Sequence, residues 1–151
     1  MWRSHSGLVA VLCLAACTRP VTFATPSGSP ETVIYGGTRA KVTNAIIARS
    51  LATGWTLHTT SEYQVVTEKP MEGTAAALMA SRYDTHPVYR ATYVLVDTRD
   101  RGLDGVRVVA TVVAVTNPGS AFERTTDFTR SKAGQEVQAL LYQLGRDVLG
   151  G

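Results

Sequence analysis

The residue types best suited to molecular recognition gather between Ser81 and Tyr93, in the stretch SRYDTHPVYRATY. Arginine and tyrosine are enriched at interface centres, because each combines a large contact area with directional hydrogen bonds. The strand alternation places Tyr89 and Tyr93 on one face with Ala91 and Leu95, which predicts that these two tyrosines are partly buried. We predict a partner-binding surface from the exposed members of the stretch, which are Arg82, Tyr83, Asp84, His86 and Arg90.

Histidine is the next candidate for chemistry, since it can bind a metal or transfer a proton near neutral pH. His58 is expected on the polar, solvent-facing side of a strand. His86 follows Asp84 by two residues, but zinc needs three or four ligands, and no cysteine or second histidine at suitable spacing completes a set. We therefore predict no metal site and no cofactor.

Nucleophilic catalysis has no recognisable motif in this chain. Gly-x-Ser-x-Gly and Ser-x-x-Lys are both absent, although each would be expected in a common class of serine enzyme. Gly36-Gly37 lacks the spacing of a phosphate-binding loop and is expected to form a turn. We predict that the protein is not an enzyme; the alternative function is a small periplasmic enzyme or a ligand-binding module.

The N-terminus holds a cysteine at the end of an apolar run. Residues 1–6 carry one arginine, and Leu8 to Ala16 follow without any charge, which is the layout of a secretory signal peptide. The run is about half as long as the roughly 20 apolar residues of a membrane-spanning helix. We expect no retained transmembrane anchor from this segment.

Leu14-Ala15-Ala16-Cys17 resembles the lipobox of bacterial lipoproteins. This resemblance implies cleavage before Cys17, a thioether-linked diacylglyceryl group on its sulfur, and acylation of the new amine with a fatty acid such as palmitate. A thiolate is the soft nucleophile that this alkylation requires. Two or three acyl chains anchor a protein firmly, whereas one chain holds only marginally.

The residue after the cysteine bears on location. Thr18 stands where an aspartate marks inner-membrane retention in lipoproteins of enteric-type bacteria, so the resemblance implies the outer membrane, with the protein facing the periplasm. Cys13 leaves with the signal peptide, so the mature chain has one modified cysteine and no disulfide.

Composition excludes a nucleic-acid partner. The formal net charge is only +3, and basic residues alternate with acidic ones, as in Arg99-Asp100-Arg101. No basic stripe therefore follows a phosphate backbone. We expect the lipid to supply membrane attachment and an envelope protein to be the partner.

The chain divides into a signal peptide (1–16), a lipidated N-terminus with a flexible tether (17–32), and a single domain (33–151). Pro20, Pro26 and Pro30 lie among Thr, Ser and Gly, a composition that buries little apolar surface. Extended at roughly 3.3 Å per residue, such a tether would hold the domain a few nanometres from the lipid.

Hydrophobic periodicity predicts the elements of the domain. A helix is expected over 39–53, strands over 55–59, 63–68, 88–97 and 106–115, a charged turn over 98–105, and a C-terminal amphipathic helix from Val137 to Val148. Residues 71–83 leave helix and strand open; their alanines favour helix, while their brevity and the following turn favour a strand, which we predict. A loop containing Phe122 and Phe128 is expected after the last strand.

The predicted class is α+β: a helix, four to five antiparallel strands, and a C-terminal helix packed on one face of the sheet. This order is loosely similar to helix-grip and BamC-like domains of envelope lipoproteins. We predict a lipid-anchored envelope lipoprotein with a non-catalytic binding or adaptor domain at the periplasmic face of the outer membrane.

Overall fold

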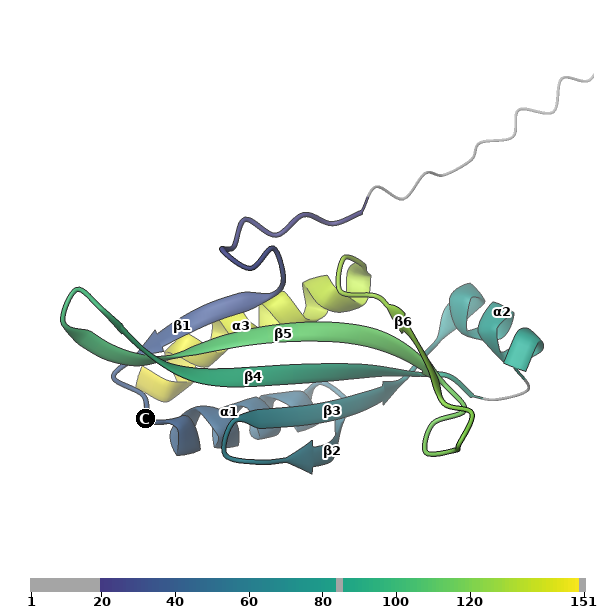
Figure 1. Cartoon of the computed structure of the whole chain (residues 1–151), viewed down its shortest axis with the longest axis horizontal. Coiled ribbons are helices and arrows are strands. Elements are labelled where there is room, and N and C mark those ends of the chain that lie inside the picture. The colour runs from purple at the N-terminus through teal and green to yellow at the C-terminus, as the bar shows by residue number, and fades with distance from the viewer. Residues whose placement is uncertain (1–19, 84–85, 150–151) are drawn as a thin grey trace, which may run out of the picture.

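The computed structural model describes residues 20–83 and 86–149. Its strands are β1 (Glu31–Tyr35), β2 (Thr56–Thr60), β3 (Gln64–Pro70), β4 (Val88–Asp100), β5 (Leu103–Thr116) and β6 (Arg124–Asp127). Its helices are α1 (Arg39–Ala52), α2 (Gly73–Tyr83) and α3 (Lys132–Leu149). The strands form one antiparallel sheet in the order β1-β5-β4-β3-β2, with β6 beside β5 (Figure 1). The α+β class is as predicted.

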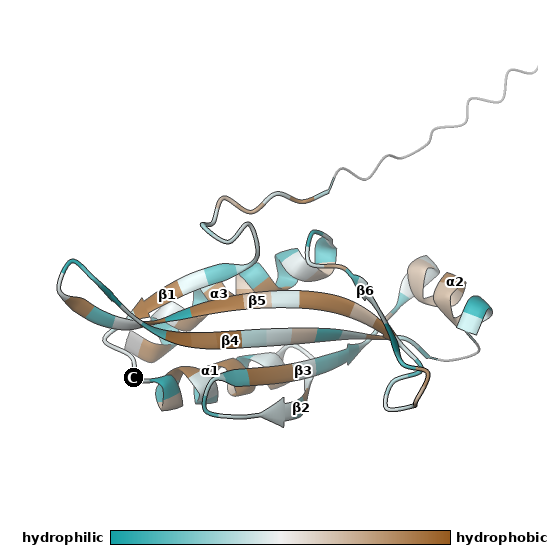
Figure 2. Cartoon of the chain, viewed as in Figure 1, coloured by the Kyte–Doolittle hydropathy of each residue, from teal (hydrophilic) through white to brown (hydrophobic). Residues whose placement is uncertain are grey.

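The hydrophobic core lies between the sheet and the two helices α1 and α3, which lie behind the sheet in Figure 1. Alternate residues of β4 and β5 face these helices, and both strands are largely hydrophobic along their central parts (Figure 2). Tyr93 is fully buried and Tyr89 packs against the same core, which confirms their predicted face. The C-terminal helix supplies Val137, Leu140, Leu141 and Leu144.

Helix α1 follows the sequence prediction closely. The Thr38 side chain accepts a hydrogen bond from the Lys41 N–H at 3.4 Å, which satisfies one free donor of the first turn. After the helix, Gly54 takes a left-handed conformation with φ 84°, as a glycine beyond a helix end commonly does. These two positions fix the length of the helix and therefore the start of β2.

The charged turn predicted over residues 98–105 is wrong in extent. Strands β4 and β5 stay paired as far as Asp100 and Leu103, and only Arg101 (φ 50°) and Gly102 (φ 82°) form the turn. Two consecutive left-handed residues match the twist of a hairpin and need few residues. Residues 99–104 are exposed on both faces, because this end of the hairpin extends beyond the helices (Figure 1).

The strand predicted within residues 71–83 is also wrong, because Gly73–Tyr83 form helix α2. Helix propensity decides the outcome, since Ala75 to Ala77 are the best helix formers and the segment has few β-branched residues. Helix α2 lies beyond the end of the sheet (Figure 1). It therefore needs no strand partner.

Two short strands were not predicted, and both pair with β5. Strand β6 lies in the expected loop and pairs with residues 113–116 of β5, while β1 begins at Glu31 and pairs with its first half. Both strands are four or five residues long. Such segments carry too little periodicity to be recognised, and their pairing with β5 determines their structure.

Part of the tether predicted over residues 17–32 is bound to the domain. The Val21 N–H donates to the Arg130 carbonyl at 3.1 Å, and the Pro30 carbonyl accepts from the Ala110 N–H at 2.8 Å. The Ser27 N–H donates to Glu31 Oε2 at 3.0 Å. Residues from Val21 onward are therefore bound to the domain, through long-range contacts that composition does not encode. The predicted signal peptide and Cys17 lie outside the described residues.

Candidate functional site

Helix α2, strand β6 and the last residue of β5 enclose a shallow cavity of about 330 Å³, which we call the α2 cleft. Helix α2 and strand β6 lie toward the end of the sheet opposite the β4–β5 hairpin turn (Figure 1). The lining residues of the cleft are Leu78, Met79, Arg82, Tyr83, Thr116, Arg124, Thr125 and Thr126. The cleft thus combines apolar, aromatic, hydroxyl and guanidinium groups.

The apolar side chains of α2 are accessible to solvent. No residue of the helix is buried, and Leu78 and Tyr83 are 64% and 37% exposed. Helices of this length usually gain their stability by burying an apolar face. A helix with exposed leucine and tyrosine at the rim of a concave surface is typical of an interaction site.

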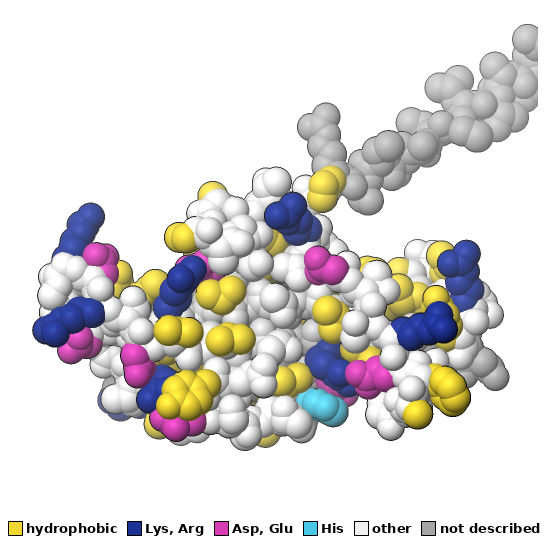
Figure 3. Space-filling model, viewed as in Figure 1, with side chains coloured by type: hydrophobic (Ala, Val, Ile, Leu, Met, Phe, Trp, Pro, Cys, Tyr) yellow, Lys and Arg dark blue, Asp and Glu magenta, His cyan; other side chains and the backbone are white. Residues whose placement is uncertain are grey.

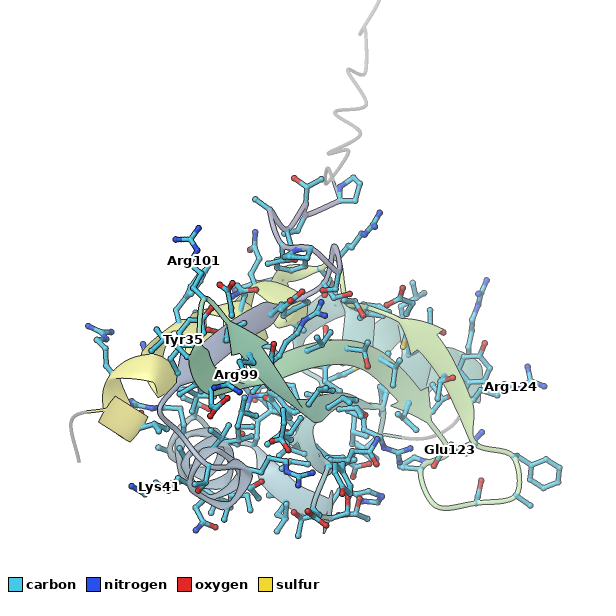
Figure 4. All side chains as sticks on the ribbon, turned by 60° about the vertical axis from the view of Figure 1, so that its left-hand side comes forward. Tyr35, Lys41, Arg99, Arg101, Glu123 and Arg124 are labelled. Carbon is cyan, nitrogen blue, oxygen red and sulfur yellow. The ribbon has the colours of Figure 1, made fainter. Side chains whose placement is uncertain are left out.

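The cleft contains two arginines, Arg82 and Arg124. Within residues 20–83 and 86–149, no ion pair involves Arg82 or Arg124. Arg124 points outward from β6, while Arg99 and Arg101 lie near the hairpin turn (Figure 4). A guanidinium presents a planar set of donors that matches a carboxylate at two points. The cleft is therefore suited to an acidic ligand.

Arg90, which we predicted as an exposed binding residue, is instead held by two carboxylates. Its Nε donates to Glu68 Oε1 at 2.7 Å, and its Nη1 and Nη2 donate to the two carboxylate oxygens of Glu123 at 2.7 and 3.2 Å. These bonds, with one from the Gly119 N–H, hold the pKa of Glu123 below its ordinary value. Arg90 thus attaches the loop before β6 to the sheet and positions Arg124, the next residue.

Of the other predicted site residues that the structure describes, His86 does not line the cleft. His86 is exposed in the segment before β4, and Asp84 lies outside the described residues. His58 is also exposed, with its Nδ1 3.6 Å from Glu68 Oε2. In the described part of the chain, no group of three or more His, Cys, Asp or Glu residues could hold a metal ion.

The structure adds residues to the site that the sequence did not indicate. Leu78 and Met79 were assigned to a strand, and Arg124 to a loop, so no pattern placed them beside Arg82 and Tyr83. A helical interpretation of the alanine-rich segment would have placed residues 78, 79, 82 and 83 on one side of a helix. Arg124 could not be found this way, because its place depends on the pairing of β6.

A second exposed surface is the face of the sheet opposite α1 and α3, the open face. Its valines are partly exposed, with Val94 at 42% and Val96 at 51%. Hydrophobic side chains are scattered over this face among polar ones (Figure 3). Its main charges pair with each other, as Arg107 does with Glu31 at 2.6 Å, whereas the two arginines of the α2 cleft form no ion pair with any other residue that the structure describes. The α2 cleft is therefore the stronger candidate site.

Comparison with known proteins adds no family: no protein-family model matches the chain, and no curated protein matches it. Among the helices described, none is long and apolar enough to cross a membrane.

Proposed function

We propose that this protein is a lipid-anchored, non-catalytic binding domain of the bacterial envelope, attached through Cys17 to the outer membrane and facing the periplasm. Its α2 cleft binds an acidic, partly apolar segment of another envelope protein. The observation that supports this most directly is that Arg82, Arg124 and the exposed Leu78 line the same cleft, while neither arginine forms an ion pair with another described residue. The lipobox-like sequence Leu14 to Cys17 supports the anchor.

Membrane attachment makes a modest binding site sufficient. Two proteins held in the same layer meet at a high effective concentration, so weak contacts produce a populated complex. In this scheme the arginines bind the carboxylates of the partner at two points each. Leu78 and Tyr83 bury apolar surface of the partner beside them, which favours a protein segment over a small acid.

The anchor is tested by the variant Cys17→Ser. We expect this protein to move from the membrane fraction to the soluble periplasm, because the acyl chains hold the wild type in the bilayer. Cell fractionation with an alkaline wash of the membranes provides the measurement. Retention of the variant in the washed pellet would contradict the lipid anchor.

The cleft is tested by the charge reversal Arg82→Glu with Arg124→Glu. Crosslinking in intact cells, followed by pull-down of the full-length protein, should recover a recurrent partner with the wild type and lose it with this variant. Truncating an arginine at an interface hot spot costs about 2 kcal/mol, or roughly 30-fold in affinity for each arginine. Leu78→Ser should also weaken capture.

The matched control is Lys41→Glu with Arg101→Glu, which makes the same change in net charge on exposed residues away from the cleft (Figure 4). This control should capture the partner as the wild type does. Circular dichroism should show that both double variants are folded, since all four positions are exposed. Equal loss of the partner in both would indicate a general charge effect and refute the cleft.

A further inference from the structure

We propose that the domain lies directly against the phospholipid surface, with the β1 edge of the sheet toward the bilayer and β2 away from it. This inference rests on the lipid anchor at Cys17 from the proposed function, and not on the α2 cleft. Composition predicts a long flexible tether that would let the domain take any orientation; in this proposal the domain has one fixed orientation.

The N-terminal segment is attached to the domain from its first described residues. The Val21 N–H donates to the Arg130 carbonyl. The ring of Phe23 is half-buried and lies over Gly134 of α3. If Gly134 carried a Cβ, that atom would lie 3.4 Å from Phe23 Cζ. Pro30 is buried and bonded to β5. The segment is thus held at three places before β1 begins.

The free length between the lipid and the domain is therefore short. Only four peptide units separate Cys17 from Val21, and four residues span at most about 14 Å when fully extended. This reach is less than the width of the sheet, because β1 and β2 are four strand spacings apart, or about 19 Å. Because residues 17–21 are too short to span the width of the sheet, the domain cannot place its β2 edge against the membrane while Cys17 stays anchored in the lipid.

The position of the chain exit selects the edge that faces the lipid. The described chain begins beside the β1 and α3 side of the molecule, and β2 lies on the opposite side (Figure 1). A basic side chain lies next to this exit (Figure 3), and Arg130, which is exposed, is the residue bonded to Val21. A guanidinium at this place is suited to the phosphate of a lipid headgroup.

The orientation is tested with the full-length lipidated protein in phospholipid vesicles. The mature chain contains no cysteine besides Cys17, so single cysteines can be labelled at Arg130→Cys, near the exit, and at Thr59→Cys on β2. Energy transfer to an acceptor on the lipid headgroups gives the distance of each label from the surface. We expect the Thr59 label to lie farther from the bilayer than the Arg130 label, by a distance on the order of the 19 Å that separate β1 from β2.

A matched variant carries a twelve-residue Gly/Ser insertion between Thr18 and Arg19. It should remain bound to the vesicles, while the difference between the two labels disappears. Equal distances for both labels in the uninserted protein, with the protein still bound, would overturn the orientation and leave the lipid anchor intact. If the protein instead failed to float with the vesicles, the anchor itself would be refuted, and the orientation with it.

Discussion

Replacing Gly134 by alanine is expected to destabilise the domain by about 3 kcal/mol, in the upper part of the range for overpacking a dense interior. Elsewhere in a helix the same change stabilises by about 1 kcal/mol, because alanine is the better helix former. Here a Cβ would lie 1.8 Å from the Thr129 carbonyl oxygen and 2.8 Å from its carbon. Steric overlap therefore outweighs helix propensity.

Thr129 cannot move away to relieve this overlap. Its Oγ1 accepts from the Val112 N–H at 3.1 Å and donates to the Val112 carbonyl at 3.3 Å, and its own N–H donates to Asp127 Oδ1 at 2.8 Å. The residue is thus fixed to the central strand β5. Phe23 packs over the same glycine, so the change should also loosen the N-terminal segment.

Gly145→Ala in the same helix is the matched control. Nothing lies within 4 Å of a Cβ at that position, so the substitution should raise the free energy of unfolding by about 1 kcal/mol. Urea denaturation of the two variants provides the measurement. Similar free energies for both variants would show that the contact between Gly134 and Thr129 does not constrain the fold.

Replacing Gln138 by methionine is expected to cost about 3 kcal/mol. The Gln138 amide accepts from the Glu31 N–H at 2.8 Å and donates to the Glu31 carbonyl at 3.1 Å. Both residues are buried, so methionine leaves one donor and one acceptor of the backbone without partners. Each such group costs about 1–3 kcal/mol. Volume is nearly conserved, which separates this effect from that of a cavity.

The control for Gln138 is Gln135→Met on an exposed position of the same helix. A surface substitution of this kind usually changes stability by no more than about 0.5 kcal/mol. Amide hydrogen exchange gives a local measurement, since the Glu31 N–H should exchange faster in Gln138→Met than in the control. Unchanged protection of this amide would show that Gln138 does not hold the first strand.

The sequence predicts the parts of the fold whose patterns are local. The Val- and Thr-rich runs of β4 and β5 and the heptad-like spacing of α3 appear in the structure as expected. Strand β1 was not predicted, because the backbone of Glu31 is bonded to Gln138, which is 107 residues away in the sequence. Helix α2 was not predicted, because its apolar periodicity is weak and the helix propensity of its alanines was given less weight than the brevity of the segment.

The candidate site was predictable in residue type and not in arrangement. Arg82 and Tyr83 were selected as interface residues, and both line the α2 cleft. Arg90 belongs to the same residue type, but its partners Glu68 and Glu123 are 22 and 33 positions away. No local pattern therefore indicates that its charge is already paired. Arg124 reaches the cleft only through the pairing of β6 with β5.

The antiparallel pairing of β1 with β5, and its attachment to α3, also govern how the chain acquires its structure. Contacts this distant in sequence slow folding, because a long loop must close before any of them forms. Strand β1 has no strand partner until β5 has been synthesised. The backbone of Glu31 on its other side has no partner until Gln138 of α3 is present. A chain that emerges from the ribosome N-terminus first therefore cannot complete this edge of the sheet until the residues of α3 have emerged.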